Sequence, residues 1–394
     1  MNDRTAFFVE PVQHGENRFD PVLGSVVILL LAIGLGTLWS ASWFRAQQLY
    51  GEPLRFILRQ GMWTGVGLTL MLIATFFPLD LLRRSMPAVV GIGLFVSILP
   101  FVPGISAQYL GAQRWIILFN VSFQPSEFVK VVLVLYLAHM LGRRKGDYSE
   151  PVTSLVPPAV MVMLFAFITL LQNDYSTSVF LVLVSLTLFF AAEVPLRYFV
   201  RTVGLVSPLA VIFLFTREHR VRRLIAFINP EFDPAGSGFQ ILAARRALES
   251  GGTWGAGIGQ GIRKIGGLPE AQSDFIFAVL GEELGYLGVV LMVVLFLIFG
   301  LRGVYLARKQ EDWFRSLVVF GCTMSITIQA LVNIAVVAGV IPATGIPLPF
   351  FSSGGSSLMV TLIMVGLTFN AAYTQPAESP SVNRRKMAAG GAYV

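Results

Sequence analysis

Ten apolar runs, each about the length that crosses a lipid bilayer, constrain this chain more than any other feature. A helix needs about 20 apolar residues to span the hydrocarbon core. The runs cover residues 22–42, 57–77, 86–105, 127–141, 155–171, 177–192, 198–216, 274–300, 316–340 and 354–372. Charged residues make up 13% of the 394 residues, against about 25% in soluble domains. The sequence therefore predicts an all-α, polytopic membrane protein and excludes a soluble enzyme.

Lysine and arginine mark one side of the predicted bundle. Short loops rich in these residues stay in the cytoplasm, and here they occupy alternate connections and the C-terminal tail. They are Arg83, Arg84, Arg143, Arg144, Lys145, Arg197, Arg201, Arg302, Arg308, Lys309, Arg315, Arg384, Arg385 and Lys386. The pattern predicts cytoplasmic tails at residues 1–21 and 373–394 around a single ten-helix domain at residues 22–372.

The connection between the seventh and eighth spans, residues 217–273, is a long exported loop that is also basic. It contains Arg217, Arg220, Arg222, Arg223, Arg245, Arg246, Arg263 and Lys264. A solvated loop is one interpretation. We favour an exported surface that attracts an anionic lipid headgroup or a pyrophosphate. Residues 238–250 have an apolar and a basic face at helical spacing, which predicts an amphipathic helix at the membrane surface.

Eight glycines follow that helix within a short stretch. They are Gly251, Gly252, Gly255, Gly257, Gly259, Gly261, Gly266 and Gly267. Glycine lets the backbone turn freely and approach a ligand closely. A phosphate cradle and a flexible hinge both fit this pattern.

Ionisable residues within spans are costly and are therefore candidates for function. Here they lie near the predicted outer ends of the spans, whereas ion-coupled transporters bind their ions near the midplane. Asp274 opens the eighth span directly after the glycine-rich segment. It is either a functional carboxylate or a helix N-cap. Helical geometry allows Glu282 to assist Asp274 and turns Glu283 towards another helix.

Lys130 stands three residues after Glu127, on the same helical face. A local ion pair is one interpretation. The other is that Lys130 binds a pyrophosphate beside Arg114, while Trp115 lies in the interfacial belt.

The segment at residues 341–357 combines three prolines with a glycine pair and offers hydroxyl groups, among them Ser356. It either lines a cavity and contacts a sugar or forms a buried re-entrant turn. The one cysteine, Cys322, cannot form an internal disulfide, and the three histidines show no metal-ligand spacing.

Taken together, these motifs resemble the SEDS family of bacterial membrane proteins, which includes FtsW, RodA and SpoVE. The matching stretches are GAQRWI at 111–116, FQPSEFVK at 123–130, QNDYST at 172–177, LPEAQSDFIFAVLGEELG at 268–285 and NIAVVAGVIPATGIPLPFFSSGGSS at 333–357. LPEA and VPGI, the latter at 102–105, are slightly more similar to the division-type FtsW than to RodA.

The resemblance implies a ten-helix peptidoglycan glycosyltransferase of the bacterial inner membrane, which polymerises lipid II and works with a class B penicillin-binding protein. It implies no nucleic-acid partner. The family's essential acidic residue falls on Asp274, and its tryptophan and lysine positions fall on Trp115 and Lys130, with Glu127 beside the lysine. Gln272 stands where the family commonly has histidine, which weakens any scheme that shares the proton between two side chains.

The expected reaction is inverting glycosyl transfer with Asp274 as general base. Basic groups would offset the charge on the leaving pyrophosphate, namely Lys130, Arg114 and the basic set from Arg217 to Lys264. From that set we single out Arg245, Arg246 and Lys264 as candidate binding residues. No cofactor is certain, although Asp274 and the substrate phosphates suit Mg²⁺ or Mn²⁺. The alternative function is a lipid II flippase, which requires a charged or hydrated route through the membrane.

Overall fold

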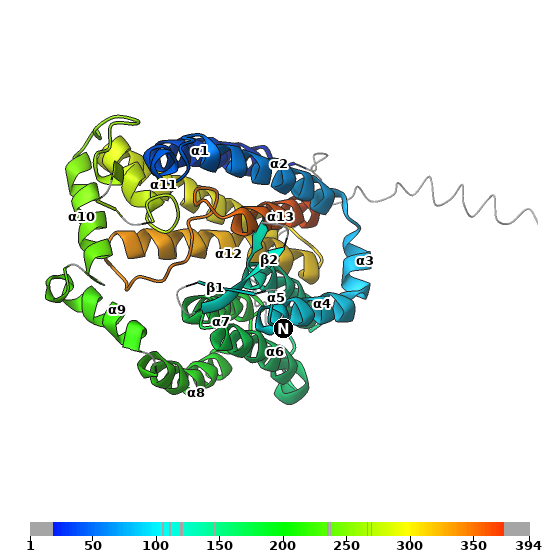
Figure 1. The fold of residues 1–394 in the computed structure, drawn as a ribbon. Helices are drawn as coiled ribbons and strands as arrows, with labels where there is room; N and C mark the ends of the chain where they lie inside the picture. Colours follow the sequence, from blue (N-terminus) through cyan, green and yellow to red (C-terminus); the bar gives the residue numbers. More distant parts are fainter. Residues whose placement is uncertain are drawn as a thin grey trace, which may run out of the picture.

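The computed structural model describes residues 19–373 except positions 105, 110, 111, 119, 120, 145, 217, 235, 237, 266 and 269. Its helices are α1 (Pro21–Tyr50), α2 (Arg55–Phe76), α3 (Leu79–Arg84), α4 (Met86–Ile98), α5 (Pro125–Gly142), α6 (Pro151–Leu171), α7 (Tyr175–Ala191), α8 (Leu196–Phe215), α9 (Glu218–Ile228), α10 (Phe239–Gly251), α11 (Ile276–Arg308), α12 (Trp313–Val337) and α13 (Gly355–Ala372). Short 3₁₀ turns lie at η1 (Leu99–Phe101), η2 (Pro230–Phe232) and η3 (Arg263–Ile265). Figure 1 shows α8, α9 and α10 along one edge of the bundle.

Seven described helices are long and apolar enough to cross a membrane, namely α1, α2, α5, α6, α11, α12 and α13. Two shorter apolar helices, α4 and α7, and the helix α8 lie where three further spans are predicted. The predicted polytopic helical membrane fold is confirmed, and the total of ten spans stays a prediction.

Several elements differ from the expected boundaries. The third span ends as an α-helix at Ile98, because Pro100 lacks the amide hydrogen that a continuing helix needs. The eighth begins at Ile276, two residues after Asp274. The exported loop holds the expected amphipathic helix as α10 and a second helix, α9, that was not expected.

A small antiparallel sheet between α4 and α5 is a further addition to the all-α expectation. It has the order β1 (Ser106–Tyr109), β2 (Ala112–Leu118) and β3 (Val121–Phe123). Ala107 pairs with Trp115, and Ile116 pairs with Phe123. The aromatic and β-branched residues here favour strands, but the segment is too short for alternation to stand out between apolar spans. The sheet fixes Arg114 and Trp115 on β2.

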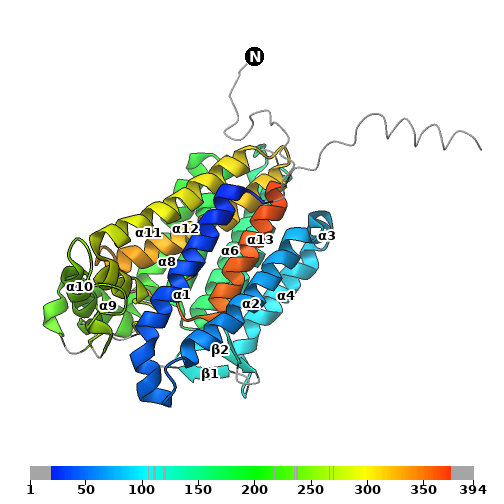
Figure 2. The same ribbon diagram turned by 90° about the horizontal axis from the view of Figure 1, so that it is seen from above.

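Both ends of the described chain lie on one side of the bundle. Figure 2 shows the first turn of α1 and the last turn of α13 at the end where α3 lies, with the strands at the opposite end. Asp20 accepts a bond from Arg302 at 2.6 Å, and Arg315 donates to the Tyr373 carbonyl at 3.0 Å. The basic loops therefore gather where the sequence places the cytoplasm. The tails themselves, 1–21 and 373–394, lie almost wholly outside the described residues.

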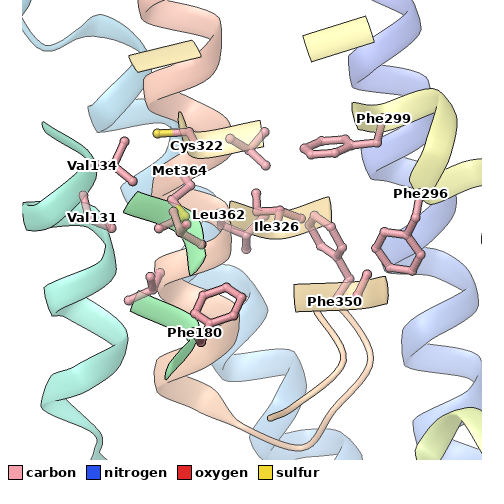
Figure 3. Close-up of a cluster of buried hydrophobic side chains, with 14 of the residues drawn as sticks. Val131, Val134, Phe180, Phe296, Phe299, Cys322, Ile326, Phe350, Leu362 and Met364 are labelled. Carbon is pink, nitrogen blue, oxygen red and sulfur yellow. The ribbon is translucent and has the colours of Figure 1, made fainter. Parts of the chain in front are cut away.

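A buried apolar cluster occupies the middle of the bundle (Figure 3). Val131 from α5, Phe180 from α7, Phe296 from α11 and Leu362 from α13 all contribute to it. Cys322 on α12 is a free thiol buried in the same cluster. Lipid tails are as apolar as these side chains, so close packing stabilises such a cluster in a bilayer.

Gly34 allows α1 to approach the segment before α13. A β-carbon at this position would collide with the backbone carbonyl of Phe350. Phe350 has a positive φ of 69°, which is unusual for a residue with a side chain. The contact at Gly34 thus holds a strained segment that continues into the candidate site.

The glycine-rich segment after α10 packs onto the exported end of α11. Ala256 donates its amide to the carbonyl of Glu282 at 2.9 Å, and Gly257 donates to that of Glu283 at 3.0 Å. Gly285, with φ 67° and ψ −166°, kinks α11 at this place. A β-carbon at Gly255 would collide with the carbonyl of Glu283. At Gly251 and Gly255 the lack of a side chain therefore serves close backbone packing rather than a phosphate cradle or a free hinge.

Two adjacent carboxylates secure this packing. Glu283 receives the ammonium of Lys264 at 2.6 Å, and Ser40 of α1 bonds to both groups. The side chains of Lys264 and Glu283 are 7% and 3% exposed. Glu282 accepts the amides of Ile262 at 2.9 Å and Arg263 at 3.1 Å. The expectation that Glu283 pairs with another helix is confirmed, while Glu282 holds the loop backbone.

We expect Gly34→Ala to destabilise the protein by about 1–3 kcal/mol, because the new methyl group meets backbone that cannot rotate away. Gly36→Ala on the same helix is the control, because no atom lies within 4 Å of its added β-carbon. Thermal unfolding in detergent measures both. Equal midpoints for the two variants would contradict the role of Gly34.

We expect Lys264→Met to destabilise the protein by about 3–5 kcal/mol, because it leaves the Glu283 carboxylate buried without its partner. The double variant Lys264→Met with Glu283→Gln removes both charges and should recover much of that loss. Arg245→Met, at an exposed surface pair, is the control. If the double variant unfolds at the same temperature as Lys264→Met alone, the pair is not what stabilises the loop.

Candidate active site

A cavity of about 520 Å³ lies at the exported end of the bundle. Its walls come from β2, α9, α10, the turn before α11, α12, the segment after α12 and the start of α13. Its polar and aromatic lining residues are Arg114, Trp115, Ser122, Gln124, Arg223, Gln240, Glu270, Ser273, Asp274, Phe275, Asn333, Thr344, Ser352, Ser353, Ser356 and Ser357. Residues distant in sequence therefore meet in one pocket.

Asp274 is held in place through its backbone. Its carbonyl accepts the amide of Asn333 at 2.9 Å, and the same Asn333 group donates to Ile346 at 2.9 Å. The Ser352 hydroxyl donates to the carbonyl of Ser273 at 2.8 Å. These bonds anchor the turn before α11 on α12 and on the segment before α13.

The Asp274 carboxylate is left unpaired by this arrangement. Among the described residues, nothing forms a hydrogen bond or ion pair with it, and it lines the cavity. The N-cap of α11 is Phe275, so the N-cap interpretation of Asp274 is wrong. Burial raises the pKa of Asp274 from 3.8, the charge of Glu270 adds to this, and Arg114 and Arg223 oppose it. A carboxylate with a raised pKa in a cavity is a candidate general base.

Arg114 reaches the cavity from β2 and is oriented by Asp174. Its Nη1 atom lies 3.9 Å from the Asp174 carboxylate, which is itself buried. Asp174 also caps α7 through the Thr177 amide at 3.2 Å and accepts the Gln124 side chain at 2.9 Å. The guanidinium is thus fixed at the wall while part of it stays open to the cavity.

Arg223 is a cavity residue that the sequence analysis did not single out. It lies on α9, where Arg220 instead donates to the Phe213 carbonyl at 2.8 Å and Arg222 pairs with Glu218 at 2.7 Å. The run of arginines was visible in the sequence. Which way each arginine points could not be predicted, because α9 itself was not expected.

The start of α13 closes another wall of the cavity. Ser356 and Ser357 line it directly after the cap at Gly354, and Ser356 is 1% exposed. A helix N-terminus presents free amides and a partial positive charge. The predicted contacts Ser356, Trp115 and Arg114 therefore share one cavity with Asp274.

Lys130 and Glu127 lie elsewhere, inside the bundle on α5. The Lys130 ammonium is 2.7 Å from the Glu127 carboxylate and 2.6 Å from Oε1 of Gln329. Both side chains are buried, at 5% and 4% exposed. Gln329 in turn donates to the Pro347 carbonyl at 2.9 Å. The geometry favours the local ion pair, which supports the cavity wall at Pro347 from behind.

Three other predicted binding residues are not among the cavity-lining residues. Arg245 pairs with Glu249 at 2.9 Å on the exposed face of α10, and Arg246 is exposed beside it. Lys264 is held by Glu283 and Ser40. The sequence missed Glu270, which lies in the cavity 3.8 Å from Arg45 and accepts the Ser273 hydroxyl at 3.0 Å.

A metal ion would find few protein ligands here. Within the described part of the chain, no group of three or more histidine, cysteine, aspartate or glutamate side chains could hold one. Of the two carboxylates among the described lining residues, Asp274 is unpaired, whereas Glu270 is engaged with Arg45 and Ser273. An ion at this site would therefore depend on phosphate oxygens for most of its ligands.

Comparison with known proteins agrees with the family resemblance that the sequence motifs indicate. Residues 22–376 match the family model for FtsW, RodA and SpoVE, described as cell cycle proteins. The chain is 37% identical to the probable peptidoglycan glycosyltransferase FtsW of Borreliella burgdorferi, over 88% of this chain and 94% of that one. It is 35% identical to stage V sporulation protein E of Bacillus subtilis, over 89% and 96%.

Solved structures agree with this assignment. A chain in a peptidoglycan synthase complex that coordinates polymerization and crosslinking superposes with a TM-score of 0.73 at 25% identity, over 90% of this chain and 97% of that one. The rod shape determining protein RodA of Thermus thermophilus gives 0.67 at 25% identity, over 91% and 98%. With its apolar spans and a family match across nearly its whole length, the chain belongs to the FtsW, RodA and SpoVE family of multi-pass membrane proteins.

Proposed function

We propose that this protein is a peptidoglycan glycosyltransferase of the bacterial inner membrane, which polymerises lipid II at the outer face. The observation that carries the proposal is the unpaired Asp274 carboxylate in an exported cavity that also holds Arg114 and Arg223. The printed names of the relatives support it, since several are called peptidoglycan glycosyltransferases.

The chemistry assigned to Asp274 is general-base catalysis. A sugar hydroxyl of the acceptor attacks the anomeric carbon of the donor, and its proton passes to the Asp274 carboxylate. The bond from that carbon to the pyrophosphate oxygen breaks, with inversion. The backbone bonds from Asn333 and Ser352 keep the carboxylate in position, and a positioned base contributes about 10² to 10⁴ in rate.

Charge on the leaving pyrophosphate needs cationic groups nearby. Arg114 and Arg223 supply two guanidinium groups, and the start of α13 adds backbone amides and a positive dipole. Such preorganised donors stabilise charge as it develops in the transition state. We assign pyrophosphate binding to this set rather than to Arg245, Arg246 or Lys264.

A divalent cation remains part of the proposal as an optional component. Asp274 would hold Mg²⁺ or Mn²⁺ together with the substrate phosphates, and the ion would then add positive charge beside the leaving group. Its requirement is open to direct titration with a chelator.

The flippase alternative finds less support. It needs a polar route between the two membrane faces, whereas the described residues at the middle of the bundle form the apolar cluster of Figure 3.

As partner we propose a class B penicillin-binding protein, since a related chain belongs to a complex that couples polymerization to crosslinking.

We expect Asp274→Asn to lower the rate of glycan synthesis by about 10² to 10⁴, because the amide cannot accept the proton. The measurement is a gel assay of strands made from labelled lipid II, with a partner whose transpeptidase serine is inactivated. Glu249→Gln, the same chemical change outside the cavity, is the control and should be near wild type. Glycan synthesis by Asp274→Asn at the wild-type rate would contradict the general-base role. Unimpaired growth of cells that carry the variant would favour a protein that only recruits its penicillin-binding partner.

The pH dependence gives a second readout for Asp274. A base works when deprotonated, so kcat/KM falls as pH drops through its pKa. Because burial raises the pKa of Asp274, we expect this fall at a pH above 3.8. A flat profile down to that pH would contradict the assignment.

We expect Arg223→Gln to raise KM for lipid II by about tenfold or more, because charge-assisted bonds to phosphate are lost. The neighbouring variant Arg222→Gln makes the same change at a residue of α9 that does not line the cavity and pairs with Glu218. Initial rates at several lipid II concentrations separate KM from kcat. Equal values for the two variants would place the pyrophosphate away from α9.

A further inference from the structure

A second cavity, of about 300 Å³, lies between α6, α7 and the start of α8. Its lining is almost wholly apolar and includes Leu155 and Val162 from α6, Phe189 from α7 and Phe199 from α8. We call it the α6–α8 groove. A groove with such walls suits a hydrocarbon chain.

The described side chains of α8 pack less closely than those of the helices at the centre of the bundle. None of the described side chains of α8 is buried, whereas α5 has buried residues along most of its length. Figure 1 shows α8 at the edge of the bundle, next to α7 and α9. The described side chains of α6, α7 and α8 therefore leave a cavity between them that a ligand could occupy.

One charged side chain lines this apolar space and is itself exposed at its edge. Arg201 lines the groove, five residues after Leu196, the first residue of α8, or about 7.5 Å along the helix axis. Among the described residues, no acidic side chain pairs with it. Arg197 lies just outside, over the Tyr198 ring at 4.9 Å. A guanidinium in an apolar membrane groove is costly unless an anion accompanies it.

The groove reaches the basic side of the bundle, where Pro151 and Arg201 line it. Helix α6 begins at Pro151 on this side. In the loop before it, the Tyr148 hydroxyl donates to the carbonyl of Ala192, directly after α7, at 2.7 Å. This is the side opposite the cavity that contains Asp274. The cytoplasmic leaflet, which the basic loops indicate on this side, carries anionic phospholipids.

We propose that the α6–α8 groove binds an anionic phospholipid of the cytoplasmic leaflet, with an acyl chain between α6 and α8 and its phosphate on Arg201. The apolar walls select the chain, and the unpaired guanidinium selects the charge. A polyprenyl phosphate has the same headgroup chemistry, but the proposed reaction releases its carrier at the opposite face. The phospholipid therefore fits the position of the groove better.

The test compares retention of two lipids by the purified full-length protein in detergent. Native mass spectrometry measures the fraction of protein that retains phosphatidylglycerol or phosphatidylcholine when the two lipids are added at equal concentrations. We expect preferential retention of phosphatidylglycerol, and about tenfold weaker retention by Arg201→Gln. Arg84→Gln makes the same charge change at an exposed position of α3, outside the groove, and should behave as wild type.

A groove-filling variant tests the acyl chain separately. Ala159 lines the groove, so Ala159→Trp should reduce phosphatidylglycerol retention while leaving Arg201 in place. Equal retention of the two lipids by wild type would overturn the proposal. So would displacement of bound phosphatidylglycerol by an equimolar polyprenyl phosphate, which would assign the groove to the carrier lipid.

Discussion

The structure depends on how the non-helical backbone at the exported end of the bundle forms its hydrogen bonds. In lipid, every amide and carbonyl needs a partner within the protein. Two non-helical segments, one before α11 and one before α13, lie among the helices there. The first bonds to the carbonyls of Glu282 and Glu283, and the second bonds to residues 272 and 273. Each segment thus helps to satisfy the other, and Asp274 lies where they meet.

The same region separates charges that are used for structure from charges that are left free. The side chains of Glu282, Glu283 and Lys264 are buried and bonded within or to the loop, and Lys130 and Glu127 neutralise each other. Asp274 differs because its backbone is bonded while its carboxylate is not. A buried charge is stable only with compensation, and here it comes from arginines across a cavity rather than from contact. Such an arrangement leaves room for a substrate between them.

Sequence reasoning recovered the large elements and missed the small ones. The spans were predictable because apolar runs of bilayer length have few other uses, and the amphipathic helix α10 showed its two faces. The sheet around Arg114 escaped because three short strands give little periodicity. Asp274 was identified by position and by family resemblance. Lys264, singled out as a binding residue, is buried in an ion pair, whereas Arg223, which was not singled out, lines the cavity. Residue type and spacing do not reveal which basic side chain a tertiary contact will bury.

Helices α1 and α11 run antiparallel and are fastened at two levels. Asp20 meets Arg302 near one membrane face, and Ser40 meets Glu283 near the other. The intervals are twenty residues on α1 and nineteen on α11, or about 30 Å on each helix. Two rods joined at two matched points cannot slide or roll against each other. The two helices therefore form a rigid pair that holds the exported loops in place, even though α11 is kinked at Gly285.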